Sequence, residues 1–200
     1  MDQRSLANDK AELRKDCHAR RNAIEPKAAA AAANEVAGRV TTEIGLAGID
    51  LTNCIVSAYW PLTSELDPRP AIRALALRGA NLALPRTVGD DNPLAFHLWR
   101  PEDPLIEGRF KVMEPAADAP SVSPKILLVP LLAFDRNCRR LGYGKGHYDR
   151  TLQKLQETDP AVRAMGIAFA AQEVDEVPTG AFDQTLDRVI TERAVHRKVS

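Results

Sequence analysis

The feature that most constrains the fold of this 200-residue chain is the segment 126–155. It begins with residues 126–134, a nearly unbroken apolar run rich in branched side chains, which predicts a short strand buried on both faces. Glycines then occupy every second position, at 142, 144 and 146. Tyr148, Leu152 and Leu155 follow at the spacing of one helix face, so we expect a helix after the last glycine. Function is expected where this strand ends.

The glycine loop is suited to binding an anion. Glycines let the backbone turn several N–H groups toward one point, and the following helix adds its positive N-terminal end. Arg139, Arg140 and Lys145 can meet phosphate oxygens, and Asp149 can hold a Mg²⁺ between them. Lys145 precedes Gly146 rather than Ser or Thr, so this is not a Walker loop. The alternative is a tight turn with solvated charges.

Composition indicates one domain over residues 1–200, since 44% hydrophobic residues at this length can form a proper core. Lys plus Arg and Asp plus Glu both number 27, so no overall field attracts nucleic acid or a membrane, and neither partner is expected. Three widely separated cysteines indicate reduced thiols in a cytoplasmic protein. We expect no targeting segment.

Strands and helices alternate along the rest of the chain, which predicts an α/β fold: a single layered α/β/α domain with a mostly parallel sheet and helices on both faces. Residues 101–125, with five prolines, are expected to form an extended surface connection. Further strands are expected at 54–60, 81–85, 94–99, 164–169 and 188–191, and helices at 1–24, from Pro26 onward and at 71–78.

Two polar features outside the central segment are candidates for the site. The N-terminal helix, 1–24, is amphipathic and places Lys10, Arg14, His18 and Arg21 on one face, although a solvated charged face is the simpler interpretation. Glu65 lies in a loop after a predicted strand, where open α/β sheets bind ligands, although a loop carboxylate usually serves only solubility.

Several motifs together resemble the signature of the 5-formyltetrahydrofolate cyclo-ligase family, also called 5,10-methenyltetrahydrofolate synthetases. They are Pro130, Ala133-Phe134-Asp135, the run from Arg140 to Gly146, and Tyr148-Asp149-Arg150. The resemblance extends from Lys10 to Glu192. It implies conversion of 5-formyltetrahydrofolate to 5,10-methenyltetrahydrofolate, with ATP as co-substrate and Mg²⁺ as cofactor.

The same resemblance implies roles for individual residues. Those expected to stabilise phosphoryl transfer are Arg14, Arg140 and Lys145. Those expected to bind ATP are Lys10, Arg14, Arg140, Leu141, Gly142, Tyr143, Gly144, Lys145, Gly146, His147 and Tyr148. Those expected at the folate are Trp60, Glu65 and Tyr148, and the expected Mg²⁺ ligands are Asp149 and Asp187. His147 and Pro68 depart from the usual pattern, which has an aromatic residue and Thr there.

Two other functions compete with this one. In the first, the ATP loop acts on a different acceptor, which would make the chain a small-molecule kinase or another ligase; Glu65 and Trp60 argue for folate instead. The chain can also be a non-catalytic module for nucleotide or RNA, against which the balanced charge and the two metal carboxylates argue. We expect a monomer.

Overall fold

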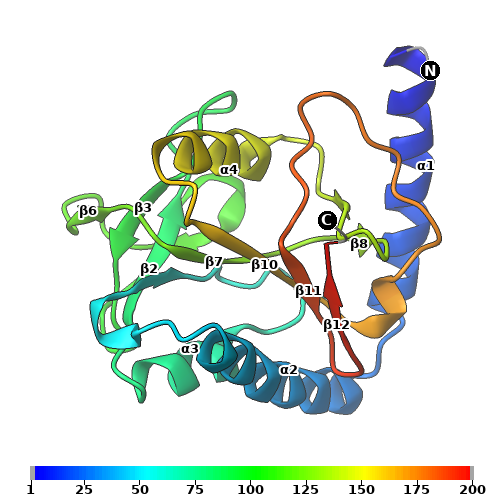
Figure 1. Cartoon of the computed structure of the whole chain (residues 1–200). Helices are drawn as coiled ribbons and strands as arrows, with labels where there is room; N and C mark the ends of the chain where they lie inside the picture. Colours follow the sequence, from blue (N-terminus) through cyan, green and yellow to red (C-terminus); the bar gives the residue numbers. More distant parts are fainter. Residues whose placement is uncertain (1–2, 199–200) are drawn as a thin grey trace.

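The computed structural model describes residues 3–198, which form one eight-stranded sheet with helices around it (Figure 1). The helices are α1 (Gln3–Asn22), α2 (Pro26–Leu46), α3 (Arg69–Ala76) and α4 (His147–Thr158). In spatial order the strands are β12 (Val195–Arg197), β11 (Arg188–Ile190), β10 (Arg163–Ile167), β7 (Ile126–Val129), β1 (Ile55–Ser57), β2 (Asn81–Arg86), β3 (Ala95–Leu98) and β6 (Ser121–Val122).

The five central strands, from β11 to β2, are parallel to one another, whereas β12, β3 and β6 pair antiparallel at the two edges. Two small ribbons lie outside the sheet: β4 (Ile106–Glu107) pairs with β5 (Met113–Glu114), and β8 (Ala133–Phe134) pairs with β9 (Arg140–Leu141). Short 3₁₀ turns are η1 (Leu51–Asn53), η2 (Arg109–Lys111) and η3 (Ala170–Gln172). The mostly parallel α/β sheet is confirmed.

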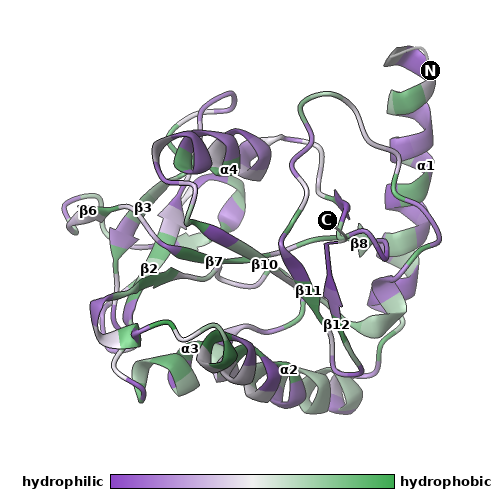
Figure 2. Ribbon diagram, viewed as in Figure 1, coloured by the Kyte–Doolittle hydropathy of each residue, from purple (hydrophilic) through white to green (hydrophobic). Residues whose placement is uncertain are grey.

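Each face of the sheet has its own core, because successive strand side chains point to opposite faces. Ile126 and Leu128 of β7 pack in the cluster that includes buried residues of α2 and α3, whereas Leu127 and Val129 pack with Leu152 of α4. Helices therefore cover both faces, as predicted. In Figure 2 α1 and α4 are coloured mostly as hydrophilic, as expected for helices that offer only a narrow face to the core.

Several element boundaries differ from the sequence prediction. The apolar run 126–134 is not one strand: β7 ends at Val129, since Pro130 has no N–H for the sheet, and only Ala133–Phe134 form the separate strand β8. Residues 101–125 contain the β4–β5 ribbon and the edge strand β6, so they are more than an extended connection. The predicted strand 54–60 is shorter, since β1 ends at Ser57.

None of the helices described between residues 3 and 198 has both the length and the hydrophobicity that a bilayer crossing requires. Cys17, Cys54 and Cys138 are buried free thiols. Burial raises the pKa of the Cys138 thiol to about 11, so it stays protonated and behaves as a core residue.

Candidate active site

A cavity of about 470 Å³ lies at the carboxyl ends of β1, β2 and β7. Tyr59, Thr87 and Pro130, each within three residues after one of these strands, line it, and the glycine loop and the start of α4 complete its wall. Open α/β sheets place ligands at this edge, because the loops that follow parallel strands converge there.

The glycine loop connects β9 to α4 and depends on left-handed backbone at two positions. Gly144 has φ +95° and Gly146, the residue that caps α4, has φ +68°. A Cβ atom at Gly146 would also lie 2.7 Å from the Arg150 guanidinium. Glycine is therefore required for the loop to reach α4 without strain, and the free N–H groups of the first helical turn face the same region.

Four cations surround this loop. Arg140 donates from Nη2 to Asp149 Oδ1 at 2.8 Å, and Lys10 Nζ lies 2.5 Å from Asp183 Oδ2. Arg14 of α1 donates from Nε to the Gly142 carbonyl at 2.9 Å. The basic row of α1 thus contacts the loop, and for Lys10 and Arg14 the interpretation as a purely solvated face is wrong.

Lys145 differs from the other three cations in its surroundings. Its Nζ lies 5.6 Å from the centroid of the Phe110 ring. A cation over an aromatic face is weakly held compared with an ion pair, so Lys145 can turn to an anionic ligand at low cost. The Arg140 Nε atom is buried without a hydrogen-bond partner in the described part of the chain, and so it too can bind a ligand.

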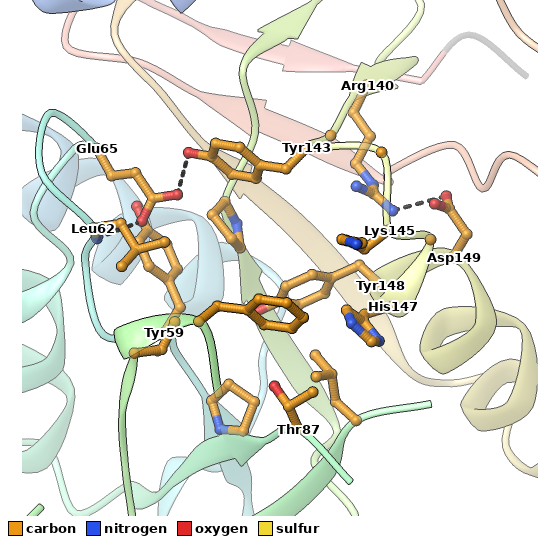
Figure 3. Close-up of a pocket in the computed structure, with 18 of the residues that line it drawn as sticks. Tyr59, Leu62, Glu65, Thr87, Arg140, Tyr143, Lys145, His147, Tyr148 and Asp149 are labelled. Carbon is orange, nitrogen blue, oxygen red and sulfur yellow. Dashed lines mark hydrogen bonds and ion pairs between the residues drawn. The ribbon is translucent and has the colours of Figure 1, made fainter. Parts of the chain in front are cut away.

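The opposite side of the cavity is largely apolar, with several phenols and two buried carboxylates, Glu65 and Glu114. Glu65 is only 9% exposed; its Oε2 accepts from the Leu62 N–H at 2.8 Å, and its Oε1 accepts from the Tyr143 hydroxyl (Figure 3). Burial raises the pKa of Glu65, while these two bonds and the charge of Arg21 oppose that rise.

Tyr148, in the first turn of α4, presents its hydroxyl group to this side. That hydroxyl is buried and has no hydrogen-bond partner in the described part of the chain. Burial and the nearby Glu65 raise the pKa of Tyr148, so the phenol remains a neutral donor. Trp60 also lines the cavity and packs edge-on against Trp99, with ring centroids 5.9 Å apart.

The segment from β4 to β5 forms a further part of the wall, which the sequence analysis did not predict. Phe110 and Val112 line the cavity, and the Phe110 ring centroid lies 6.2 Å from that of His147. Phe110 is nevertheless 48% exposed. An aromatic residue in a proline-rich connection was a possible signal, but nothing local indicated that the connection folds back. Other lining residues not predicted are Tyr59, Leu62, Pro85, Thr87, Leu94, Glu114 and Asp183.

The chain is similar over most of its length to proteins of one known family. A model described as the 5-formyltetrahydrofolate cyclo-ligase family matches residues 6–192. The chain belongs to this family. The 5-formyltetrahydrofolate cyclo-ligase of Escherichia coli K12 is 35% identical over 144 residues, covering 68% of this chain and 76% of that protein. The Haemophilus influenzae enzyme of the same name is 32% identical over 136 residues, covering 66% and 72%.

Solved structures agree with this assignment. The NMR structure of Aquifex aeolicus 5,10-methenyltetrahydrofolate synthetase has a TM-score of 0.76 and 28% identity, covering 96% of this chain and 93% of that one. A Mycoplasma pneumoniae 5,10-methenyltetrahydrofolate synthetase matches with a TM-score of 0.72 at 20% identity, covering 92% and 99%, and supports the fold alone. The resemblance to the cyclo-ligase family is confirmed.

The structure brings together nearly all the residues that the cyclo-ligase signature implied. Those that line the cavity are Lys10, Arg14, Trp60, Glu65, Arg140, Leu141, Gly142, Tyr143, Gly144, Lys145, Gly146, His147, Tyr148 and Asp149. His147, the departure from the family pattern, donates from Nδ1 to the Asn92 carbonyl, 3.1 Å away, and its buried Nε2 lacks a partner among the described residues.

Asp187 is the exception and requires a correction. It precedes β11, and its Oδ2 accepts from the Ala164 N–H at 2.7 Å, near the start of β10. Both parallel strands begin there, so Asp187 lies toward the amino ends of the strands rather than at the cavity. Asp183, four residues earlier, lines the cavity instead. The prediction that Asp149 and Asp187 meet at one ion is therefore not supported by the geometry.

Proposed function

We propose that this chain converts 5-formyltetrahydrofolate to 5,10-methenyltetrahydrofolate with ATP, releasing ADP and phosphate. The observation that supports this best is that one cavity contains two chemically different sides. One side is a glycine loop with Lys10, Arg14, Arg140 and Lys145, suited to polyphosphate; the other is a largely apolar wall that contains the Glu65 carboxylate. A reaction between a nucleotide and a flat heterocycle needs both.

The chemistry explains why a nucleotide must lie beside the folate. Ring closure requires N10 of the folate to attack the formyl carbon and expel the formyl oxygen, a poor leaving group. Transfer of the γ-phosphoryl group to that oxygen breaks the bond to ADP and forms a new P–O bond. N10 then bonds to the carbon and loses its proton, and the oxygen leaves as part of phosphate. No side chain need act as a covalent nucleophile.

The cations on the loop side would neutralise charge as the phosphoryl group moves. We assign this role to Arg14, Arg140 and Lys145, with Lys10 and the loop amides binding the remaining phosphate oxygens. Lys145 is the strongest candidate, because its Nζ contacts an aromatic ring rather than a carboxylate and can turn to the phosphate. The backbone from 141 to 148 would hold the nucleotide.

The apolar side would hold the pterin. Each Glu65 oxygen accepts one hydrogen bond from the protein and has a second lone pair, so the carboxylate can accept from pterin N–H donors. The Tyr148 hydroxyl, buried without a partner in the described structure, is placed to hydrogen-bond a substrate group. Trp60 offers an aromatic surface at the cavity wall.

Mg²⁺ is a further part of the proposal. Across residues 3–198 no cluster of three or more His, Cys, Asp or Glu side chains forms a metal site. Mg²⁺ at nucleotide sites commonly binds one or two carboxylates together with phosphate oxygens, and Asp149 and Asp183 supply two carboxylates on the cavity wall. These donors fit the ion. When bound, it would neutralise phosphate charge.

The direct test is to mix purified protein with 5-formyltetrahydrofolate, ATP and Mg²⁺ and to follow the near-ultraviolet absorbance of the methenyl product. Product is expected only with all components present, and ADP should form in equal amount. A mixture without ATP is the control. No absorbance change with folded protein would contradict the proposed activity.

A further inference from the structure

Arg21, in the last turn of α1, is a buried cation whose side-chain hydrogen bonds run to hydroxyl groups rather than directly to a carboxylate. The residue is 2% exposed. Its Nε donates to Ser64 Oγ at 3.1 Å, and its Nη1 donates to the Tyr143 hydroxyl at 2.5 Å. Burying a guanidinium costs free energy unless its positive charge is compensated. The compensating anion must therefore be a group that hydrogen-bonds to one of those hydroxyls.

The directions of the hydrogen bonds show where the charge is compensated. A guanidinium has donors only, so the Tyr143 oxygen must accept from Arg21, and its own proton is free to be donated to Glu65 Oε1. Arg21, Tyr143 and Glu65 therefore form one chain from cation to carboxylate, the second part of which is drawn in Figure 3. This chain favours an ionised Glu65 in an apolar wall.

Tyr143 also belongs to the glycine loop, between Gly142 and Gly144, and is 39% exposed. The two flanking glycines have few intrinsic backbone restraints of their own, so the segment that carries Tyr143 is costly to order. Arg14, two helical turns before Arg21 on α1, holds the Gly142 carbonyl. One helix therefore holds both the loop and the tyrosine that orients Glu65.

We propose that Arg21 and Tyr143 are positioning residues that couple the two sides of the cavity, so that a nucleotide on the glycine loop tightens folate binding at Glu65. A nucleotide that orders the loop removes part of the entropy cost of holding Tyr143 against Glu65, and the folate then binds a carboxylate that is already oriented. This inference rests on the proposed function, because it assumes that nucleotide and folate occupy these two sides.

The test is titration calorimetry of 5-formyltetrahydrofolate with and without saturating ADP, which cannot support turnover. In the wild-type protein ADP is expected to lower the folate Kd about fivefold or more. Tyr143→Phe keeps the ring and removes the hydroxyl, so its folate Kd should rise about tenfold. Its ADP effect, which is the folate Kd without ADP divided by the folate Kd with ADP, should fall toward one.

Tyr148→Phe is the matched control, because it removes a phenol hydroxyl from the same cavity but outside the chain of hydrogen bonds. It should keep the wild-type ADP effect even if folate binds more weakly. Arg21→Lys, which retains charge but loses the planar fork, should give an intermediate ADP effect and serves if Tyr143→Phe does not fold. Melting curves verify folding.

Three results would overturn the coupling: no ADP effect in the wild type, an unchanged ADP effect in Tyr143→Phe, or an unchanged one in Arg21→Lys. Failure of the folded wild-type protein to bind 5-formyltetrahydrofolate at all would instead contradict the proposed function. The two failures are therefore distinguishable in the same experiment.

Discussion

The two sides of the cavity differ in how the chain builds them. The loop side consists largely of ten consecutive residues, 140–149, whose backbone and charges act together, joined by Lys10, Arg14 and Asp183. The apolar side is collected from residues after β1 and β2, from the β4–β5 segment and from α4. Local sequence therefore specifies the proposed phosphate site almost completely, whereas the proposed site for the heterocycle depends on how distant segments pack.

The largest expected effect is on the loop side. Lys145→Ala should lower turnover about 100-fold or more with the fold intact, because a cation at the transferring group acts mainly in the transition state. Steady-state rates at saturating ATP give the measurement. Lys145→Arg should also perform poorly, since a planar fork cannot replace a compact ammonium group. Near-normal turnover in Lys145→Ala would remove this residue from the chemistry.

Glu65→Gln should affect the other side selectively. An amide presents one N–H₂ group where a carboxylate accepts, so the folate Kd is expected to rise about tenfold to 100-fold while the ATP Kd changes little. Separate titrations of the two ligands measure this. Equal weakening of both would mean that the two sides are not chemically distinct.

The metal proposal can be tested with three matched substitutions. Asp149→Asn and Asp183→Asn should each raise the Mg²⁺ concentration for half-maximal activity by about tenfold. Asp187→Asn should leave it unchanged, because that side chain holds the Ala164 N–H. Activity against Mg²⁺ at fixed ATP decides between them. Shifts in Asp149→Asn and Asp187→Asn, without one in Asp183→Asn, would restore the prediction made from the sequence.

The raised pKa of Glu65 also predicts opposite pH trends for folate affinity and for the stability of the fold. Because its pKa in the folded protein is raised by burial, acidification protonates it in the folded state before the unfolded state. Folate affinity should therefore fall as pH decreases through the folded-state pKa. The free energy of unfolding, relative to that of Glu65→Gln, should rise as pH decreases over the same range. This gain in stability should be complete below the pKa of Glu65 in the unfolded state.

Folate titrations and chemical unfolding of the wild type and Glu65→Gln, each at several pH values, measure both trends. Binding by Glu65→Gln should lose the acid-dependent branch. Parallel pH trends for binding and stability would show that Glu65 is not the group that titrates.

The smallest expected effect concerns the wall segment over the cavity. Lys111 has φ +58°, a left-handed conformation that costs an L-residue about 1 kcal/mol. Lys111→Gly should relieve this strain and raise the melting temperature by about 2–4 °C, and Lys111→Ala, which keeps a Cβ, should not. Differential scanning calorimetry measures the difference. Equal melting temperatures for the two variants would mean that the backbone relaxes there.

By itself the sequence determined the α/β class, the glycine loop, the start of α4 and the family, because each depends on residues close together in the chain. Periodicity identified β2 from its first residue, Asn81, and the glycines identified the turn into His147. The same local signals could not predict that the 126–134 run breaks at Pro130. They also could not predict that the residues after the break pair with β9 to form the β8–β9 ribbon.

Only the tertiary structure decided which polar residues share the cavity. Asp183 and Asp187 are equivalent in a one-dimensional pattern, but Asp183 faces the cavity while Asp187 holds an amide near the start of β10. Phe110 joins the cavity through a ribbon with no local signal, and Arg21 reaches Glu65 through a tyrosine 122 residues away in sequence. Such contacts depend on loop closure and packing between distant segments, which short-range sequence patterns do not encode.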